Sequence, residues 1–229
     1  MTDLTEVCAM KNVRLWYKKE GLAKYASHLD LVRCFSRAVR RAQIPIWYTE
    51  GFNPKPYMTF PLPLSLGQQG MHEPLDIRIT DEISCDEIVK RMNSTLPTGL
   101  EIVLAGDPVM DSKEIAFAEY SAKLDFQDSD KAQRFAKAAA AVIESGELMA
   151  EKKSKKGIKT VNLCEMVKSF SADAENETCK IKTVISAGNT LNLNVELLID
   201  TLEKATECED YVRSIIREKL LTNDMTDFC

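Results

Sequence analysis

Four arginines recur along a segment whose apolar spacing predicts a helix over residues 27–42. At about 100° per residue they share one side of that helix, away from the apolar positions Leu31 and Phe35. The four are Arg33, Arg37, Arg40 and Arg41. Because arginine matches phosphate oxygens with two parallel N–H bonds, the stripe predicts a surface for RNA or another anion. A solvated basic face with local ion pairs, such as Asp30 with Arg33, explains the same pattern.

A stiff loop follows this helix. Its sequence is Glu50-Gly51-Phe52-Asn53-Pro54-Lys55-Pro56. Glycine permits backbone angles that other residues avoid, and proline fixes φ at about −65°. Such a loop would present Glu50, Asn53 and Lys55 in a set geometry, with Lys55 extending the anion surface. The aromatic residues around it are of the kind that stack on nucleobases, namely Trp47, Tyr48, Phe52 and Tyr57. The alternative is a rigid strand connection that sends half of these rings to the core.

Catalytic and metal-binding patterns are missing from the sequence. The two histidines, His28 and His72, and the seven cysteines show no ligand spacing, so we expect no bound metal and no cofactor. The three-cysteine cluster of radical-SAM enzymes and the common nucleotide and hydrolase motifs are also absent. We therefore expect no independent catalytic activity. The alternative is an enzyme that uses His28, Asp30 or Glu50 as its acid or base.

The elements that must position these residues follow from hydrophobic periodicity. Ser27 is a suitable N-cap for the arginine helix, with Asp30 in its first turn. The first half is expected to contain strands at 13–17, 75–79 and 100–104, an extended segment at 47–60, and helices at 27–42 and 84–92. This order of strand, helix, strand, strand, helix, strand is typical of the ferredoxin-like pattern.

The second half is expected to begin the same pattern again after a polar boundary at 106–114. It is predicted to contain strands at 120–126, 148–153, 166–171 and 179–186, helices at 131–144 and 195–205, and a basic turn at 152–157. We expect the tail at 211–221 to be a short helix entering a strand. The predicted fold class is α+β, with two tandem ferredoxin-like units that have antiparallel sheets, at residues 1–108 and 115–229.

Charge is uneven along the 229 residues. The net charge is −5, yet residues 1–60 carry ten Lys/Arg and five Asp/Glu. A basic first quarter on an acidic body favours one local surface for a polyanion or an acidic partner. Apolar runs are far shorter than the ~20 residues that span a bilayer, and no secretory signal is evident. We expect a cytoplasmic protein that binds no membrane.

Several motifs of the first half resemble one known family. They are Ser27–Asp30, the Arg40-Arg41 pair, Glu50–Pro54 and the proline-rich exit Pro61–Gly67. Together they resemble the radical-SAM-linked DUF2344 family, a bacterial domain of unknown function. The resemblance implies that Ser27, His28, Asp30, Glu50, Gly51, Phe52, Asn53 and Pro54 have a functional role. It covers residues 12–105 most specifically and extends more loosely to about residue 221.

The resemblance also implies partner proteins, and it implies no catalytic activity for the domain itself. Members of the family occur fused to, or encoded beside, radical-SAM proteins with a cobalamin-binding-type domain, and near genes for ribonucleases and ribosomal proteins. We therefore expect an accessory or substrate-presenting module for a radical-SAM partner, acting on RNA or a ribosome-related substrate and not on DNA. The alternatives are an RNA modification or processing enzyme that uses His28, Asp30 and Glu50, and a protein-interaction scaffold.

Overall fold

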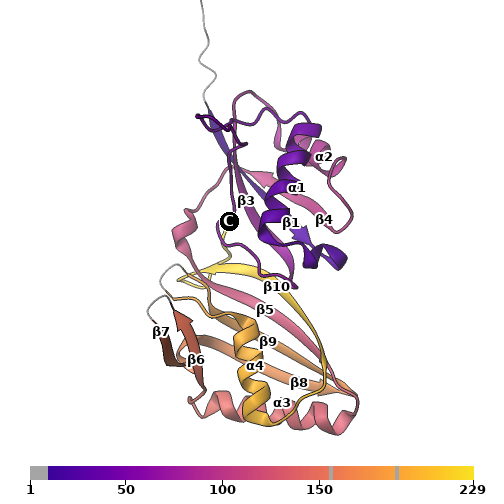
Figure 1. Cartoon of the computed structure of the whole chain (residues 1–229), viewed down its shortest axis with the longest axis vertical. Helices are drawn as coiled ribbons and strands as arrows, with labels where there is room; N and C mark the ends of the chain where they lie inside the picture. Colours follow the sequence, from indigo (N-terminus) through magenta and orange to yellow (C-terminus); the bar gives the residue numbers. More distant parts are fainter. Residues whose placement is uncertain (1–9, 155–156, 189–190) are drawn as a thin grey trace, which may run out of the picture. The chain divides into compact units, whose positions relative to one another are not determined.

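The computed structural model describes residues 10–154, 157–188 and 191–229, with backbone alone for the described residues between 152 and 158. The N-terminal stretch with Cys8 and the centre of the predicted basic turn lie outside the described residues. Internal contacts divide the chain into two compact units (Figure 1). Unit 1 is Met1–Ser112 together with Cys229, and unit 2 is Lys113–Phe228. The described residues form four α-helices and mostly antiparallel β-sheet.

Unit 1 is built on an antiparallel sheet in which β1 lies between β4 and β3, and the short strand β2 pairs with β3. Its strands are β1 (Lys11–Lys19), β2 (Met58–Thr59), β3 (Gln69–Ile79) and β4 (Leu100–Gly106). Successive side chains of a strand point to opposite faces. Val13, Leu15 and Tyr17 of β1 therefore enter the core, whereas Asn12 and Arg14 lie on the other face.

Two helices cover the core face of this sheet (Figure 1). They are α1 (His28–Arg41) and α2 (Cys85–Asn93), and a short 3-10 helix, η1 (Gly21–Tyr25), precedes α1. The buried positions of α1 include Leu31 and Phe35, as the periodicity predicts, and those of α2 are Ile88 and Met92. All four side chains belong to one hydrophobic cluster with the strands, so α1 is held rigidly by its apolar face.

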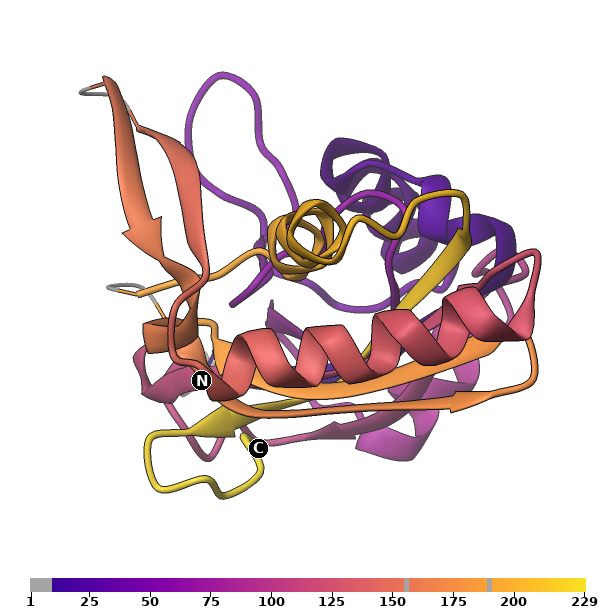
Figure 2. The same ribbon diagram turned by 90° about the horizontal axis from the view of Figure 1, so that it is seen from below.

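Unit 2 has an antiparallel sheet with the strand order β10-β5-β9-β8. Its strands are β5 (Ile115–Asp125), β8 (Val167–Glu175), β9 (Thr178–Ser186) and β10 (Val212–Thr222). The helices α3 (Ser129–Glu144) and α4 (Val195–Thr206) lie on the same side of this sheet (Figure 2). The 3-10 helix η2 (Ser112–Glu114) precedes β5.

A two-stranded hairpin is inserted between α3 and β8, and Figure 2 shows it extending away from the unit 2 sheet. It consists of β6 (Met149–Ser154) and β7 (Gly157–Asn162), followed by η3 (Leu163–Met166). Asn162 closes its base: Oδ1 accepts from the Leu148 amide at 3.0 Å, and Nδ2 donates to the Gly146 carbonyl at 2.8 Å. The sequence predicts β6 but not β7.

The C-terminal tail differs from its prediction. Instead of a short helix entering a strand, Val212–Thr222 is a strand throughout and pairs with β5. The register shifts between Arg217 and Lys219, which breaks the alternation of buried and exposed positions. The pattern therefore departs from a period of two, and this departure explains the wrong helical prediction.

Candidate functional site

Ser27 organises the start of α1. Its Oγ accepts a hydrogen bond from the Asp30 amide at 3.2 Å, and its hydroxyl donates to Asp30 Oδ2 at 2.6 Å. The hydroxyl bond lowers the pKa of the Asp30 carboxyl, and Arg33 at 3.6 Å adds to this effect. Asp30 is therefore an anion that caps and orients the basic helix, a role that does not require it to exchange protons near neutral pH.

Three of the four predicted arginines meet in one groove. Arg33, Arg37 and Arg41 line a depression of about 350 Å³ together with Asp30, Cys34 and Pro97. Arg41 is fixed there, because its Nη2 donates to the Thr95 carbonyl at 2.7 Å. The groove thus has cationic walls supplied by α1 and a floor that includes the turn after α2.

Arg37 and Arg40 are exposed cations of this helix for which the described residues supply no partner. No hydrogen bond or ion pair to either guanidinium occurs among residues 10–154, 157–188 and 191–229. Arg40 is not part of the groove lining, and neither is Lys55. The predicted anion surface is therefore a groove with Arg40 on the same helix beyond it, and Lys55 belongs to a different element.

Cys34 lies within the arginine groove. Partial burial raises the pKa of its thiol, and the charges of Arg41 and Arg37 oppose this effect without cancelling it. A thiol with a raised pKa is a poor nucleophile at neutral pH, so we assign Cys34 to the groove wall and not to covalent chemistry.

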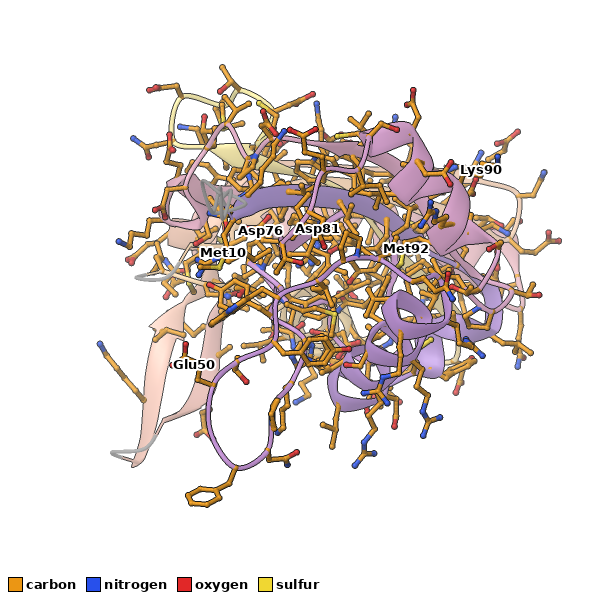
Figure 3. The ribbon with its side chains drawn as sticks, turned by 90° about the horizontal axis from the view of Figure 1, so that it is seen from above. Met10, Glu50, Asp76, Asp81, Lys90 and Met92 are labelled. Atoms are coloured by element: carbon orange, nitrogen blue, oxygen red, sulfur yellow. The ribbon has the colours of Figure 1, made fainter. Side chains whose placement is uncertain are left out.

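The stiff loop forms a hairpin-like arm between Trp47 and Tyr57. The Thr49 amide donates to the Lys55 carbonyl at 2.8 Å, the Lys55 amide donates to Thr49 Oγ1 at 3.1 Å, and the Tyr57 amide donates to the Trp47 carbonyl at 2.8 Å. Gly51 at the turn has φ +121°, a conformation that side chains disfavour. Figure 3 shows Glu50 on this open arm, well away from Lys90 and Met92 of α2.

The arm carries one fully solvated ring at its tip. Phe52 has a relative exposure of 110%, and its neighbours Gly51, Asn53 and Pro54 are exposed as well. The other predicted stacking residues are occupied: Trp47 and Tyr57 pack on the Arg78 guanidinium, 5.3 and 4.6 Å from the ring centres. Tyr48 packs against the core. Phe52 is therefore the aromatic of this group that is free to contact a ligand.

Both histidines contact aromatic rings. His28 meets Phe60 edge-on at 5.2 Å between ring centres, and His72 stacks on Trp16 at 4.5 Å. The residues of the alternative acid/base set are not gathered in the arginine groove, which contains Asp30 but neither His28 nor Glu50.

The opposite face of the unit 1 sheet holds polar residues that the sequence prediction missed. Arg14 pairs with Asp76, and a cavity of about 420 Å³ is lined by residues from β1, β2, β3 and the segment after β4. The available signal was the alternation itself, since Asn12 and Arg14 occupy the non-core positions of β1, opposite Arg78 and Asp76 of β3.

Two kinds of feature are absent from the part of the chain that the structure describes. Among the described residues, no three His, Cys, Asp or Glu side chains are grouped so that they could hold a metal ion. In that same part of the chain, no helix combines the length and apolar character needed to cross a bilayer.

Comparison with known proteins identifies one family. The family model DUF2344, "uncharacterized protein conserved in bacteria", matches residues 12–195. No curated protein matches the sequence. Among solved structures, the crystal structure of an unknown protein from Galdieria sulphuraria aligns over 90% of this chain and 98% of that chain, with 10% identity and a TM-score of 0.27. A TM-score this low supports no inference about fold or function.

Proposed function

We propose that this chain, which belongs to the DUF2344 family of uncharacterized bacterial proteins, binds single-stranded RNA through unit 1 and presents it to a radical-SAM enzyme. In this proposal the module has no chemistry of its own, and the partner supplies the iron–sulfur reaction. The observation that carries the RNA proposal is a pair of exposed cations, Arg37 and Arg40, on the helix that lines the arginine groove; the described part of the chain supplies a partner to neither.

Repulsion between these charges supports an anionic ligand. Like charges one helical turn apart destabilise a helix unless a nearby anion neutralises them. Among the described residues, Asp30 pairs with Arg33 at 3.6 Å, and Arg41 donates to the Thr95 carbonyl. A phosphate backbone could neutralise Arg37 and Arg40 at the protein surface. Both side chains are exposed, so little water would have to be removed from them on binding.

Phe52 supports a single strand as the ligand. Unpaired bases offer a π-face that an exposed ring can stack on, whereas a duplex hides its bases. Lys55 is exposed on the same arm, three residues after Phe52, and can contact the RNA backbone next to a stacked base.

Salt dependence of RNA binding tests the proposal. Binding of the full chain to a labelled single-stranded RNA of mixed sequence should weaken steeply as salt rises, with a slope of roughly −0.7 per phosphate contact. The double variant Arg37→Gln/Arg40→Gln should reduce the magnitude of that slope by about 1.4 and weaken binding. Arg41 is kept because it ties α1 to the Thr95 carbonyl.

The matched control is Lys137→Gln/Lys204→Gln, which removes two exposed cations from helices of unit 2. Equal losses of RNA affinity in the two double variants would show that general electrostatics explains the binding, and would overturn Arg37 and Arg40 as an RNA site. Failure of the wild-type chain to bind RNA would overturn the function as a whole.

The partnership with a radical-SAM protein is supported by the family resemblance of the motifs in residues 27–67. Affinity isolation of the tagged chain from its own cell, with both protein and RNA identified, tests it. Recovery of a radical-SAM protein in stoichiometric yield is the expected result, and recovery of RNA without any such protein would refute the partnership.

We also infer that the two units are a tandem pair of ferredoxin-like folds. Each begins with strand, helix and strand and ends with strand, helix and strand, and unit 2 adds the β6–β7 hairpin. The antiparallel orders β4-β1-β3, with β2 on β3, and β10-β5-β9-β8 agree with this pattern. An experimental structure with parallel neighbouring strands in either unit would refute it.

A further inference from the structure

A second cavity lies on the face of the unit 1 sheet that points away from α1 and α2. Its volume is about 420 Å³, within the usual size range of small-ligand sites. The strands and Tyr57 contribute polar groups to its lining, from Asn12, Arg14, Tyr57, Thr59 and Asp76, and the apolar side chain of Ile77. The segment after β4 contributes apolar surface from Pro108, Val109 and Met110, and polar groups from Asp111 and Ser112.

Several polar atoms at this cavity have hydrogen-bonding capacity to spare. Asn12 Oδ1 accepts from Arg78 Nε at 3.1 Å, which leaves its amide Nδ2 as a donor. In the described part of the chain, the hydroxyls of Tyr57 and Thr59 make no hydrogen bond. Asp76 accepts from Arg14 through both oxygens, yet a carboxylate can accept about four bonds, and its side chain remains 23% exposed.

The two cations nearby are already engaged. Arg14 is bound by Asp76 and by the main-chain oxygen of Cys229 at 3.0 Å. Arg78 lies over the rings of both Trp47 and Tyr57, at 5.3 and 4.6 Å from their centres. This cavity is therefore poorly suited to a phosphate, in contrast to the arginine groove, and favours a neutral, flat ligand with both donors and acceptors on its edge.

Asn12 and Asp76 are diagonal neighbours on one face, because Arg14 is opposite Asp76 and Asn12 is opposite Arg78. The cavity thus offers an amide donor beside a carboxylate acceptor. The Watson–Crick edge of guanine carries the complementary groups, a carbonyl oxygen beside two N–H donors. Adenine offers no carbonyl, and uracil would direct its second carbonyl at the carboxylate.

We propose that this cavity binds a guanine base, with Asp76 accepting from its N–H groups and Asn12 donating to its carbonyl. The proposal rests on the proposed RNA-binding function for its biological ligand and names the base that is read. The apolar segment Pro108–Met110 would cover one face of the base, and Val109, which is 77% exposed, would be buried by it.

Free nucleosides test this cavity without involving the arginine groove, because they carry no phosphate. Titration of the full chain with guanosine, adenosine, cytidine and uridine, followed by NMR, should show guanosine bound at least about tenfold more tightly than the others. Equal binding of guanosine and adenosine, or no binding of guanosine, would overturn the proposal.

Asn12→Asp is the decisive variant. A carboxylate at this exposed position still accepts from Arg78 but repels the guanine carbonyl, so guanosine binding should be lost while the thermal transition is retained. The matched control, Asn223→Asp in an exposed turn of unit 2, should bind guanosine like the wild type. Unchanged binding by Asn12→Asp would refute the assigned role.

Tyr57→Phe supplies an independent check, because it removes a hydroxyl and keeps the ring on Arg78. A modest loss of guanosine affinity, about threefold to tenfold, is expected if the hydroxyl bonds the nucleoside.

The failure of this proposal can be distinguished from the failure of the RNA proposal. Guanosine binding without RNA binding would support the guanine site and refute the RNA proposal. RNA binding without guanosine binding would do the reverse.

Discussion

Arg14 and Asp76 form a two-pronged salt bridge across β1 and β3, with Nε to Oδ1 at 2.7 Å and Nη2 to Oδ2 at 3.0 Å. The guanidinium is almost fully buried, with 2% of the side chain exposed, whereas the carboxylate reaches the cavity edge at 23%. The carboxylate compensates a buried charge on the non-core face of the sheet and also borders the proposed base site.

Asp76→Asn should therefore destabilise unit 1. Removing the Asp76 charge takes the two-pronged partner from a buried guanidinium and leaves it with weaker interactions, and we expect a loss of about 3 kcal/mol in the free energy of unfolding. Urea denaturation measures it. The control Glu82→Gln changes an exposed acid of the same unit and should stay within about 0.5 kcal/mol of the wild type. An equally stable Asp76→Asn variant would show that the other interactions of Arg14, among them the main-chain oxygen of Cys229 and the Trp16 ring, suffice to hold it.

Local sequence signals predicted α1 well. Ser27 caps it through the Asp30 amide, and Leu31 and Phe35 are buried. Each of these features depends on residues within one or two helical turns, so hydrophobic periodicity and capping preferences are sufficient to predict it. The exposed arginine stripe follows from the same helical geometry, because Arg37 and Arg40 must lie opposite the apolar face.

Contacts between distant segments were beyond local signals. Pairing of Arg14 with Asp76 depends on the β1–β3 register, and the Arg41 bond to Thr95 depends on how α1 and α2 pack. Trp47 is likewise covered by the Arg78 guanidinium, and this contact depends on the position of Arg78 in β3. A single sequence shows that these residues are polar or aromatic but does not show which distant residue will engage them.

Phe52→Ala should separate binding from stability. Because the ring is fully exposed, truncation removes no packing, and the thermal midpoint should not change. RNA affinity should fall by about 1–3 kcal/mol if a base stacks there. Leu22→Ala is the control, because Leu22 is an 85% exposed apolar residue of η1, outside the arm, and its truncation should leave RNA affinity unchanged. Unchanged RNA binding by Phe52→Ala would remove the arm from the RNA site and leave the arginine groove to stand alone.

Unit 2 should lose stability at alkaline pH through Cys179. This side chain is fully buried on β9, and burial raises the pKa of its thiol from its ordinary value near 9 to about 11, with a smaller contribution from the charge of Asp173. Burial and the hydrogen bond to Glu203 raise the pKa of Tyr211 in the same direction. Folding therefore favours the protonated form of both groups.

The sign follows from where each state holds its proton. Below about pH 9 both states keep the Cys179 proton, so its full contribution is present. As pH rises from about 9 to about 11 the unfolded chain releases that proton first, and the free energy of unfolding should fall by up to about 1.4 kcal/mol per pH unit. Cys179→Ala should flatten this slope, whatever its cavity costs at neutral pH, and Tyr211 should leave a residual slope. The control Cys229→Ala, at an exposed thiol, should keep the wild-type slope. Equal slopes in the wild type and Cys179→Ala would show that the thiol does not stay protonated in the folded unit.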